Sequence, residues 1–267
     1  SSGVLQTAPA NQPRLNHSYI GSAWTQPAVL IEPASINEVY KSESFDDAQW
    51  GKSNSSILAN STTAPDGTTT ADTLVEDASN SYHTVSQNPS KPNGSGPFTL
   101  SVFAKANTRT AISLSFNNST TEDNGYASAT FDLSNGTTGT VTGRPSVKPS
   151  ATITPAGNGW YRCSLSAAGV GPNFFHIGVS NSITPTLEDY GRAAYVGDST
   201  SSIYIWGAQL EQTWGPTSYI PSPNNSTATR AADIVAPTVQ PLMSLGDHYN
   251  LSSTDSAYKI DTYTLID

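Results

Sequence analysis

The stretch Ser202-Ile-Tyr-Ile-Trp-Gly-Ala-Gln-Leu-Glu-Gln-Thr-Trp-Gly-Pro-Thr-Ser-Tyr-Ile220 is the segment around which we expect the chain to fold. It begins as a strand, because Ile203 and Ile205 project to one side while a tyrosine and a tryptophan project to the other. Both sides are apolar, which is typical of a strand covered on both faces. The Trp-Gly-Pro that follows ends the strand. The sequence therefore predicts a central, sheet-closing strand here.

The overall composition excludes several classes of function. Only 12% of the 267 residues are charged, and 12 basic residues against 21 acidic ones give a formal net charge of −9. Nucleic acids and anionic membranes both need a cationic patch, so neither is an expected partner. No apolar run approaches the roughly 20 residues that span a bilayer. Cys163 is the only cysteine, which excludes an intrachain disulfide and a cysteine-based zinc site.

Short alternating strands recur through the middle of the chain, separated by Gly- and Asn-rich turns, and no long amphipathic helix is visible. We expect strands at 71–75, 98–105, 111–116, 127–133, 151–154, 160–165 and 174–180. A single helical turn at 46–49, anchored by Phe45 and Trp50, is the one helical feature expected. The pattern predicts an all-β fold, an antiparallel β-sandwich of jelly-roll type.

The two ends of the chain differ from its middle in composition and hydrophobic pattern. Four prolines within 1–33 favour an extended N-terminal arm. We expect the sandwich to occupy 34–221 and a linker with a short C-terminal tail to occupy 222–267. The tail contains strand candidates at 234–239 and 258–266. It is too short for a confident core of its own, so we expect it to pair with another chain or to fold back.

No catalytic constellation is recognisable in the sequence. The four histidines are far apart, and the adjacent carboxylate pairs would face opposite ways on a strand. We therefore expect no enzymatic activity and no cofactor. A structural calcium ion held by loop carboxylates and carbonyls is the alternative interpretation of the acidic pairs.

Aromatic residues are the better candidates for a binding site, because sugars stack on flat aromatic faces. Trp160 and Arg162 share one side of their strand and could form an exposed platform with a donor beside it; the alternative is that a loop or the N-terminal arm covers them. Trp214, like Trp24, lies in a loop and is an exposed candidate for sugar stacking or for a subunit contact. Gln209 is a polar position that could reach a groove or a calcium ion.

Several motifs, in this order and spacing, resemble a domain of bacteriophage fibre and head-spike proteins. They extend over roughly residues 3 to 235 and read Gly3-Val-Leu-Gln-Thr-Ala8 with Pro13-Arg14, Leu30-Ile-Glu-Pro-Ala34, Tyr40-Lys-Ser-Glu-Ser-Phe45, Ala64-Pro-Asp-Gly-Thr-Thr-Thr-Ala-Asp72, Leu100-Ser-Val-Phe-Ala-Lys105, Asn158-Gly-Trp-Tyr-Arg162, Trp206-Gly-Ala-Gln-Leu-Glu211, Thr217-Ser-Tyr-Ile-Pro221 and Thr229-Arg-Ala-Ala-Asp233.

The resemblance implies a non-catalytic virion component whose sandwich is similar to carbohydrate-binding jelly rolls. It carries over no catalytic residue. We expect a homo-oligomer, with a trimer favoured, that attaches to other virion proteins and is displayed on the virion surface. Two departures stand out. Ser35-Ile36 replaces a usual Arg-Thr pair, so a polar contact is expected to be lost, and only a short tail follows Asp233, which favours a compact spike, a decoration protein or a short fibre.

Two other functions fit the sequence. One is a carbohydrate-binding module that contacts host surface polysaccharide, which overlaps the first reading and differs in requiring a real ligand site. The module could also belong to a glycan-degrading system. The other is a depolymerising enzyme, which would have to release oligosaccharide from a host capsule.

Overall fold

The structure of the protein is a computed structural model. It describes residues 4–6, 14–16, 19–20, 23–24, 28–89, 96–118, 125–169 and 171–233. The described residues up to Asp233 form one compact unit. The strands expected at 234–239 and 258–266 lie outside the described residues. The compact unit continues past Pro221, where we expected the sandwich to end.

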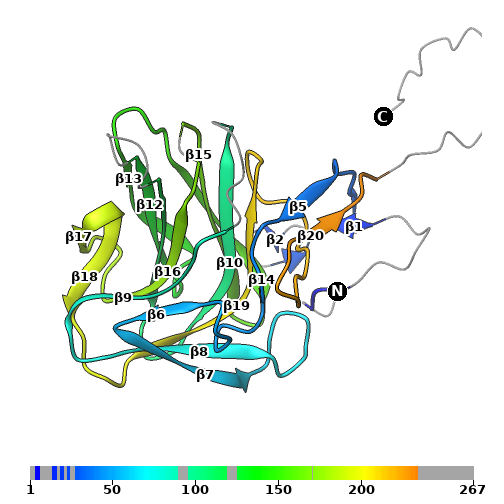
Figure 1. The fold of residues 1–267 in the computed structure, drawn as a ribbon. Helices are drawn as coiled ribbons and strands as arrows, with labels where there is room; N and C mark the ends of the chain where they lie inside the picture. Colours follow the sequence, from blue (N-terminus) through cyan, green and yellow to red (C-terminus); the bar gives the residue numbers. More distant parts are fainter. Residues whose placement is uncertain are drawn as a thin grey trace, which may run out of the picture. The chain divides into compact units, whose positions relative to one another are not determined.

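Two large antiparallel sheets face each other in a β-sandwich (Figure 1). The first is six-stranded and contains, in spatial order, β14 (Ser150–Gly157), β15 (Trp160–Ala167), β10 (Phe98–Ala106), β19 (Ser202–Glu211), β8 (Ala71–Glu76) and β7 (Ser55–Thr62).

The second sheet is eight-stranded. Its spatial order is β13 (Thr137–Gly143), β12 (Tyr126–Asp132), β11 (Ala111–Asn117), β16 (Phe174–Ser180), β9 (Asn80–Gln87), β18 (Arg192–Val196) and β17 (Thr186–Glu188), with β6 (Gly51–Ser53) also on β9. The chain crosses between the sheets from β8 to β9, to β10 and to β11. This alternation confirms the predicted jelly-roll sandwich.

Three small two-stranded sheets accompany the sandwich. They pair β1 (Leu15–Asn16) with β4 (Ala28–Val29), β2 (Tyr19–Ile20) with β3 (Ala23–Trp24), and β5 (Ser35–Asn37) with β20 (Ala228–Arg230). The last pair joins the segment that enters the sandwich to the segment that leaves it. The N-terminal segment therefore contains four short strands, β1 to β4, ahead of β5.

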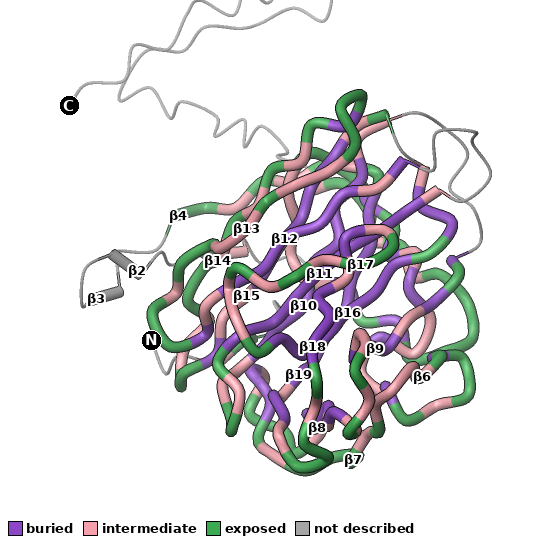
Figure 2. The backbone as a smooth tube through the Cα atoms, turned by 90° about the vertical axis from the view of Figure 1, so that its left-hand side faces the viewer, coloured by how far each residue is buried: buried purple, intermediate pink, exposed green. Residues whose placement is uncertain are grey.

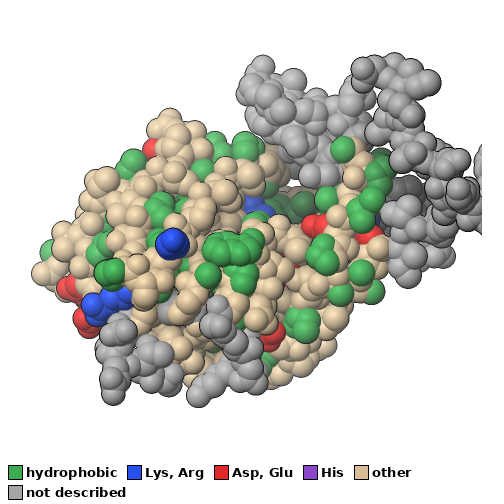
Figure 3. Space-filling model, turned by 90° about the horizontal axis from the view of Figure 1, so that it is seen from above, with side chains coloured by type: hydrophobic (Ala, Val, Ile, Leu, Met, Phe, Trp, Pro, Cys, Tyr) green, Lys and Arg blue, Asp and Glu red, His purple; other side chains and the backbone are tan. Residues whose placement is uncertain are grey.

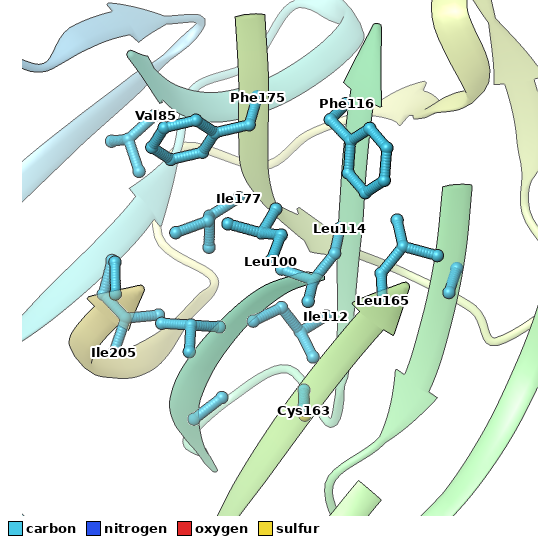
Figure 4. Packing of buried hydrophobic residues seen from close by; sticks show 14 of the residues in the cluster. Val85, Leu100, Ile112, Leu114, Phe116, Cys163, Leu165, Phe175, Ile177 and Ile205 are labelled. Atoms are coloured by element: carbon cyan, nitrogen blue, oxygen red, sulfur yellow. The ribbon is translucent and has the colours of Figure 1, made fainter. Parts of the chain in front are cut away.

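The hydrophobic core fills the space between the sheets (Figure 4). Alternate residues of β10, β11, β15, β16 and β19 point inward, as their two-residue period requires. Large members with no exposed surface include Leu100, Ile112, Leu114, Phe116, Leu165, Phe175, Ile177 and Ile205. Cys163 is also buried here, and burial raises the pKa of its thiol, so it packs as a small apolar residue.

Strand β19 is the central strand that the sequence predicted. It pairs with β10 on one side and with β8 on the other, and residues on both of its faces are buried. Gly207 has a φ of 63° where the register against β10 shifts, so the strand contains a bulge. After the bulge Ala208 and Leu210 face the core, which leaves Gln209 and Glu211 on the outer side.

The prediction of a helical turn at 46–49 is wrong. The segment forms hydrogen-bonded turns instead, in which the amides of Asp47 and Trp50 donate to the carbonyls of Ser44 and Asp47. Its anchors are as predicted, since Phe45 and Trp50 are buried with ring centroids 4.6 Å apart. Packing of these two rings fixes the segment without a helix.

Candidate functional site

Trp160 lies on the outer face of the six-stranded sheet, but it is not exposed. Only 2% of its surface is accessible, and its indole NH donates to the Thr63 carbonyl at 3.1 Å. It belongs to a second apolar cluster with Phe103 and Trp206. The prediction of an exposed stacking platform at Trp160 is therefore wrong, because these aromatic residues cover one another and a loop covers them.

Arg162 is engaged by the protein itself. Its Nη1 donates to the Thr217 carbonyl at 2.6 Å and its Nη2 to Ser101 Oγ at 3.0 Å. Burial lowers the pKa of the guanidinium to about 10, although the charges of Glu211 and Glu32 raise it. Even so it stays protonated at neutral pH. The side chain is thus a structural cation under a covering segment, and the prediction that it serves an exposed platform is wrong.

Gln209 has no exposed surface. Its Oε1 accepts the Ile220 amide at 2.7 Å, and its Nε2 donates to the Ser218 carbonyl at 3.4 Å. The prediction that Gln209 reaches a groove or a calcium ion is wrong, because both ends of its amide hold the outgoing segment against the sheet.

Of the predicted binding residues whose side chains the structure describes, Trp214 is the one at the surface, with 62% of it exposed; the side chain of Trp24 lies outside the description. Trp214 lies just past the end of β19, as expected from the Trp-Gly-Pro break. The loop is tied down on both sides of it, since Thr99 Oγ1 donates to the Thr213 carbonyl at 2.8 Å and accepts the Gly215 amide at 2.9 Å. Trp214 is therefore held outward on a fixed loop, about which Trp160, Arg162 and Gln209 do not gather.

Glu211 is the centre of a buried network that the sequence did not reveal. Its carboxylate accepts Ser35 Oγ at 2.5 Å, the Thr217 amide at 3.0 Å and Thr217 Oγ1 at 2.5 Å. Through Ser35 the entry segment makes a polar contact with this carboxylate, and whether an Arg-Thr pair at 35–36 would add another contact stays a prediction. Charge balance comes instead from Arg162.

Asn37 forms hydrogen bonds with the part of the β19 edge that no described strand of the sheet pairs with. Its Nδ2 donates to the carbonyls of Ala208 and Ile220 at 3.2 and 2.8 Å, and its Oδ1 accepts the Leu210 amide at 3.2 Å. The Glu38 amide donates to the Leu210 carbonyl at 2.9 Å. Strand β8 pairs only with the first half of β19, so the incoming segment satisfies the second half.

Four charged residues, Arg14, Glu32, Arg230 and Asp233, form what we call the terminal cluster. Arg14 Nη1 lies 2.7 Å from Glu32, Arg14 Nη2 contacts Asp233, and Arg230 Nη1 lies 3.4 Å from Glu32. Burial raises the pKa of Glu32, but hydrogen bonds from Arg14 and Ser218 outweigh it and leave that pKa lowered. Hydrogen bonds from Arg14 also lower the pKa of Asp233. The chain thus enters and leaves the sandwich side by side, as β5 and β20 show in Figure 1.

A second buried carboxylate, Glu76, lies at an end of the sandwich. Arg109 donates to it from Nε and Nη2 at 3.0 and 2.6 Å, and Tyr195 Oη donates at 2.6 Å. The Asp198 amide adds a fourth bond at 3.0 Å. A carboxylate whose oxygens are all occupied in this way fastens neighbouring loops to β8.

Among the described residues, no three His, Cys, Asp or Glu side chains gather as metal ligands would. The structural calcium ion and the expected lack of a cofactor therefore stay predictions. Seen from above, most of the described surface is neither charged nor hydrophobic (Figure 3). No helix in the described part of the chain is long and apolar enough to cross a membrane.

Comparison with known proteins finds a distant likeness among solved structures. No family model matches the chain, and no curated protein matches it. The enzymatically active domain of tailspike protein 4 of bacteriophage CBA120 is similar over 65% of this chain, at 15% identity and a TM-score of 0.36. The matched part spans 21% of that chain. The fold and the networks above rest on this chain's own strands and contacts.

Proposed function

We propose that the chain is a non-catalytic structural component of a bacteriophage virion, a fibre, head-spike or decoration protein that displays its sandwich on the particle surface. The observation that carries the proposal is the convergence in space of the motifs that resemble the phage domain. They come from separate parts of the chain, yet residues from most of them bond directly to one another.

The convergence can be followed residue by residue. Glu32 accepts the Ser218 amide at 2.8 Å, Arg162 donates to Thr217, and Glu211 accepts from Thr217. Arg14 and Asp233, more than two hundred residues apart, share the terminal cluster. Motifs retained by chance have no reason to meet, so their contact supports a shared structural domain and not a coincidence of composition.

The paired ends suit a displayed lobe. Because β5 and β20 are neighbours in one small sheet, the sandwich projects from a single attachment region and flanking segments need not pass through it. We propose that this region faces other virion proteins and further copies of the chain, with a trimer favoured. The acidic, lysine-poor composition fits a surface that avoids nucleic acid.

The test is direct detection on particles. Antibodies against residues 28–233, coupled to gold, would be applied to washed particles of the phage or induced prophage that encodes the chain. We expect label at one fixed structural position, and the chain in the mass spectrum of the particles. Expression in infected cells without any incorporation into particles would overturn the proposal.

A carbohydrate-binding module, either for host attachment or within a glycan-degrading system, is the second candidate, and Trp214 is the observation that favours it. A tryptophan with 62% exposure on a tied loop offers a ready stacking surface. Binding to a host polysaccharide that Trp214→Ala abolishes would support this site. Binding that survives the substitution would remove Trp214 from consideration.

A further inference from the structure

The outer face of the eight-stranded sheet contains two adjacent transverse rows in which no side chain is larger than an imidazole. We call these ten positions the hydroxyl face. Cross-strand pairing defines the first row as Gly51, Ser86, His176, Ser115 and Ser128, and the second row as Ser53, Thr84, Gly178, Ser113 and Thr130.

These positions face away from the core. Ile112, Leu114 and Phe116 of β11 are in the core, so Ser113 and Ser115 between them point outward. Figure 2 views the molecule from this side, with buried stretches of β11, β12 and β16 running across it. Nine of these ten neighbouring positions are serine, threonine or glycine, which is unusual because the outer face of a strand more often carries long polar side chains.

Two glycines keep the side chains of these rows short. A Cβ on Gly178 would lie 2.8 Å from Ser113 Oγ and 2.8 Å from Thr84 Cγ2, so no larger residue fits between them. A Cβ on Gly51 would lie 3.1 Å from Ser86 Oγ. The two rows therefore form a depression relative to the larger side chains that border them.

Small residues alone do not make a site, but this face also contains buried polar atoms that lack partners. Thr84 Oγ1, Asn117 Oδ1 and His176 Nδ1 make no hydrogen bond, and their residues are 2%, 1% and 9% exposed. Asn117 pairs with Phe174 in the row next to His176. Leaving each atom unsatisfied costs about 1–3 kcal/mol, so three on one face indicate that a polar group from outside completes them.

Aromatic side chains border the depression. Phe174, two residues from His176 on the same face, is 38% exposed. On another side Arg192 stacks on Tyr82, with its guanidinium carbon 3.4 Å from the ring centroid. Arg192 also donates from Nε to the Asp189 carbonyl at 2.9 Å, so its charge is already engaged.

We propose that the hydroxyl face binds an uncharged glycan, whose hydroxyls bond to the unpartnered atoms and whose sugar ring stacks on Phe174. Serine, threonine and neutral histidine both donate and accept, and sugar hydroxyls need that combination. An anion would need free cations, and Arg192 is the one cation described among these bordering residues. The inference deepens the proposed function and rests on it for its biological sense.

The neighbouring loop is consistent with ligand access from one side. The segment that contains β17 and the short 3-10 helix η1 (Asp189–Gly191) crosses the sheet over β11 and β12. Ser128 Oγ donates to the Gly191 carbonyl at 2.5 Å and Thr130 Oγ1 to the Ile183 carbonyl at 2.5 Å. Strand β18 also contacts β16 and β11, and seven of the ten positions are buried, so the open part of the face is its end beside β6, where Gly51, Ser53 and Ser86 lie.

The experiment compares this face with the Trp214 loop. An array of uncharged oligosaccharides, made from glucose, galactose, mannose and N-acetylglucosamine, would be probed with the whole chain. The affinity of the best oligosaccharide would then be measured by calorimetry for wild type, Phe174→Ala and Ser86→Leu. Thr152→Leu, at an exposed position of β14 in the other sheet, and Trp214→Ala are the matched controls.

We expect Phe174→Ala and Ser86→Leu to weaken binding about tenfold or more, with both controls unchanged. Thermal melts of each variant separate lost folding from lost binding. No binding to any sugar on the array would overturn the inference, and so would binding that Trp214→Ala abolishes and Phe174→Ala leaves intact. Particle labelling tests the proposed function independently, so the two failures are distinguishable.

Discussion

The two outer faces of the sandwich differ in how they are used. The six-stranded sheet carries large residues there, Phe103, Trp160 and Trp206, each 2% exposed, and the loop between β7 and β8 and the outgoing segment cover them. The eight-stranded sheet carries the hydroxyl face, which the segment from β17 to β18 covers except at the end beside β6. The difference teaches that aromatic residues mark the face that closes the fold, while the small polar residues mark the face whose open end we assign to a ligand.

The largest effect on stability should come from the outer face of the six-stranded sheet, which we call the closed face. Replacing Glu211 with alanine removes the acceptor of Ser35 and Thr217 and leaves Arg162 without its nearest negative charge. An uncompensated buried cation costs about 3–5 kcal/mol. We expect the free energy of unfolding in urea to fall by about that amount. Glu188→Ala, which removes an exposed carboxylate, is the control and should leave it unchanged; equal effects of the two would contradict the account of the closed face.

As the pH falls, the stability that depends on His176 of the hydroxyl face should be lost at a higher pH than the stability that the terminal cluster contributes. Burial, helped by the Arg192 charge, lowers the pKa of His176 to about 3. The unfolded chain then takes up a proton near pH 6.5 that the folded chain does not, so stability falls as pH drops from about 6.5 toward 3. Glu32 and Asp233 have lowered pKa values, so their contribution is lost only below about pH 4.5.

Comparison with His176→Asn isolates the histidine contribution. We expect wild type to lose on the order of 2 kcal/mol more than this variant between pH 7 and pH 4. The buried Asp72, whose pKa burial raises to about 6, acts in the opposite direction but equally in both proteins. Parallel stability curves for the two proteins would show that His176 is not held neutral on this face.

Replacing the glycines of the hydroxyl face with alanine should destabilise the protein less than these changes do. Gly178→Ala places a Cβ against Ser113, Thr84 and the His83 carbonyl, and such overpacking costs about 1–3 kcal/mol. Gly51→Ala meets only a hydroxyl that can rotate, so it should cost less than Gly178→Ala. Thermal melts of both variants check the order. A reversed order would mean that the depression between β11 and β9 is not as tight as the contacts indicate.

The smallest effect is expected at Trp214. Its side chain is mostly in solvent, so Trp214→Ala should change the free energy of unfolding by no more than about 0.5 kcal/mol. Trp206→Ala, on the closed face, is the paired variant and should cost several times more. A large effect at Trp214 would show that its loop supports the sandwich.

The strands were predictable where hydrophobic alternation is strong. β10, β11 and β16 contain inward Leu100, Ile112 and Ile177 at a two-residue period, and β19 was expected to be covered on both faces. Strands β6, β7, β9, β13, β17 and β18 were missed. In β13, Thr-Thr-Gly-Thr has no apolar face to detect, and β17 and β18 depend on pairing with distant β9.

The site was less predictable, for a physical reason. Trp160 and Gln209 have residue types that suit sugar binding, but which segment covers an outer face depends on contacts between distant parts of the chain, such as the hydrogen bond from Trp160 to the Thr63 carbonyl, 97 residues away. The hydroxyl face has the opposite problem. Ser115, His176 and Thr84 are unremarkable in sequence, and only the cross-strand register brings them together.

The most direct test of the difference between the faces is an amide chemical-shift titration of the wild-type chain with the oligosaccharide selected on the array. The account predicts shifts confined to β9, β11 and β16, around Ser86, Ser115 and His176. Shifts clustered instead at the loop around Trp214, or none at saturating oligosaccharide, would contradict it.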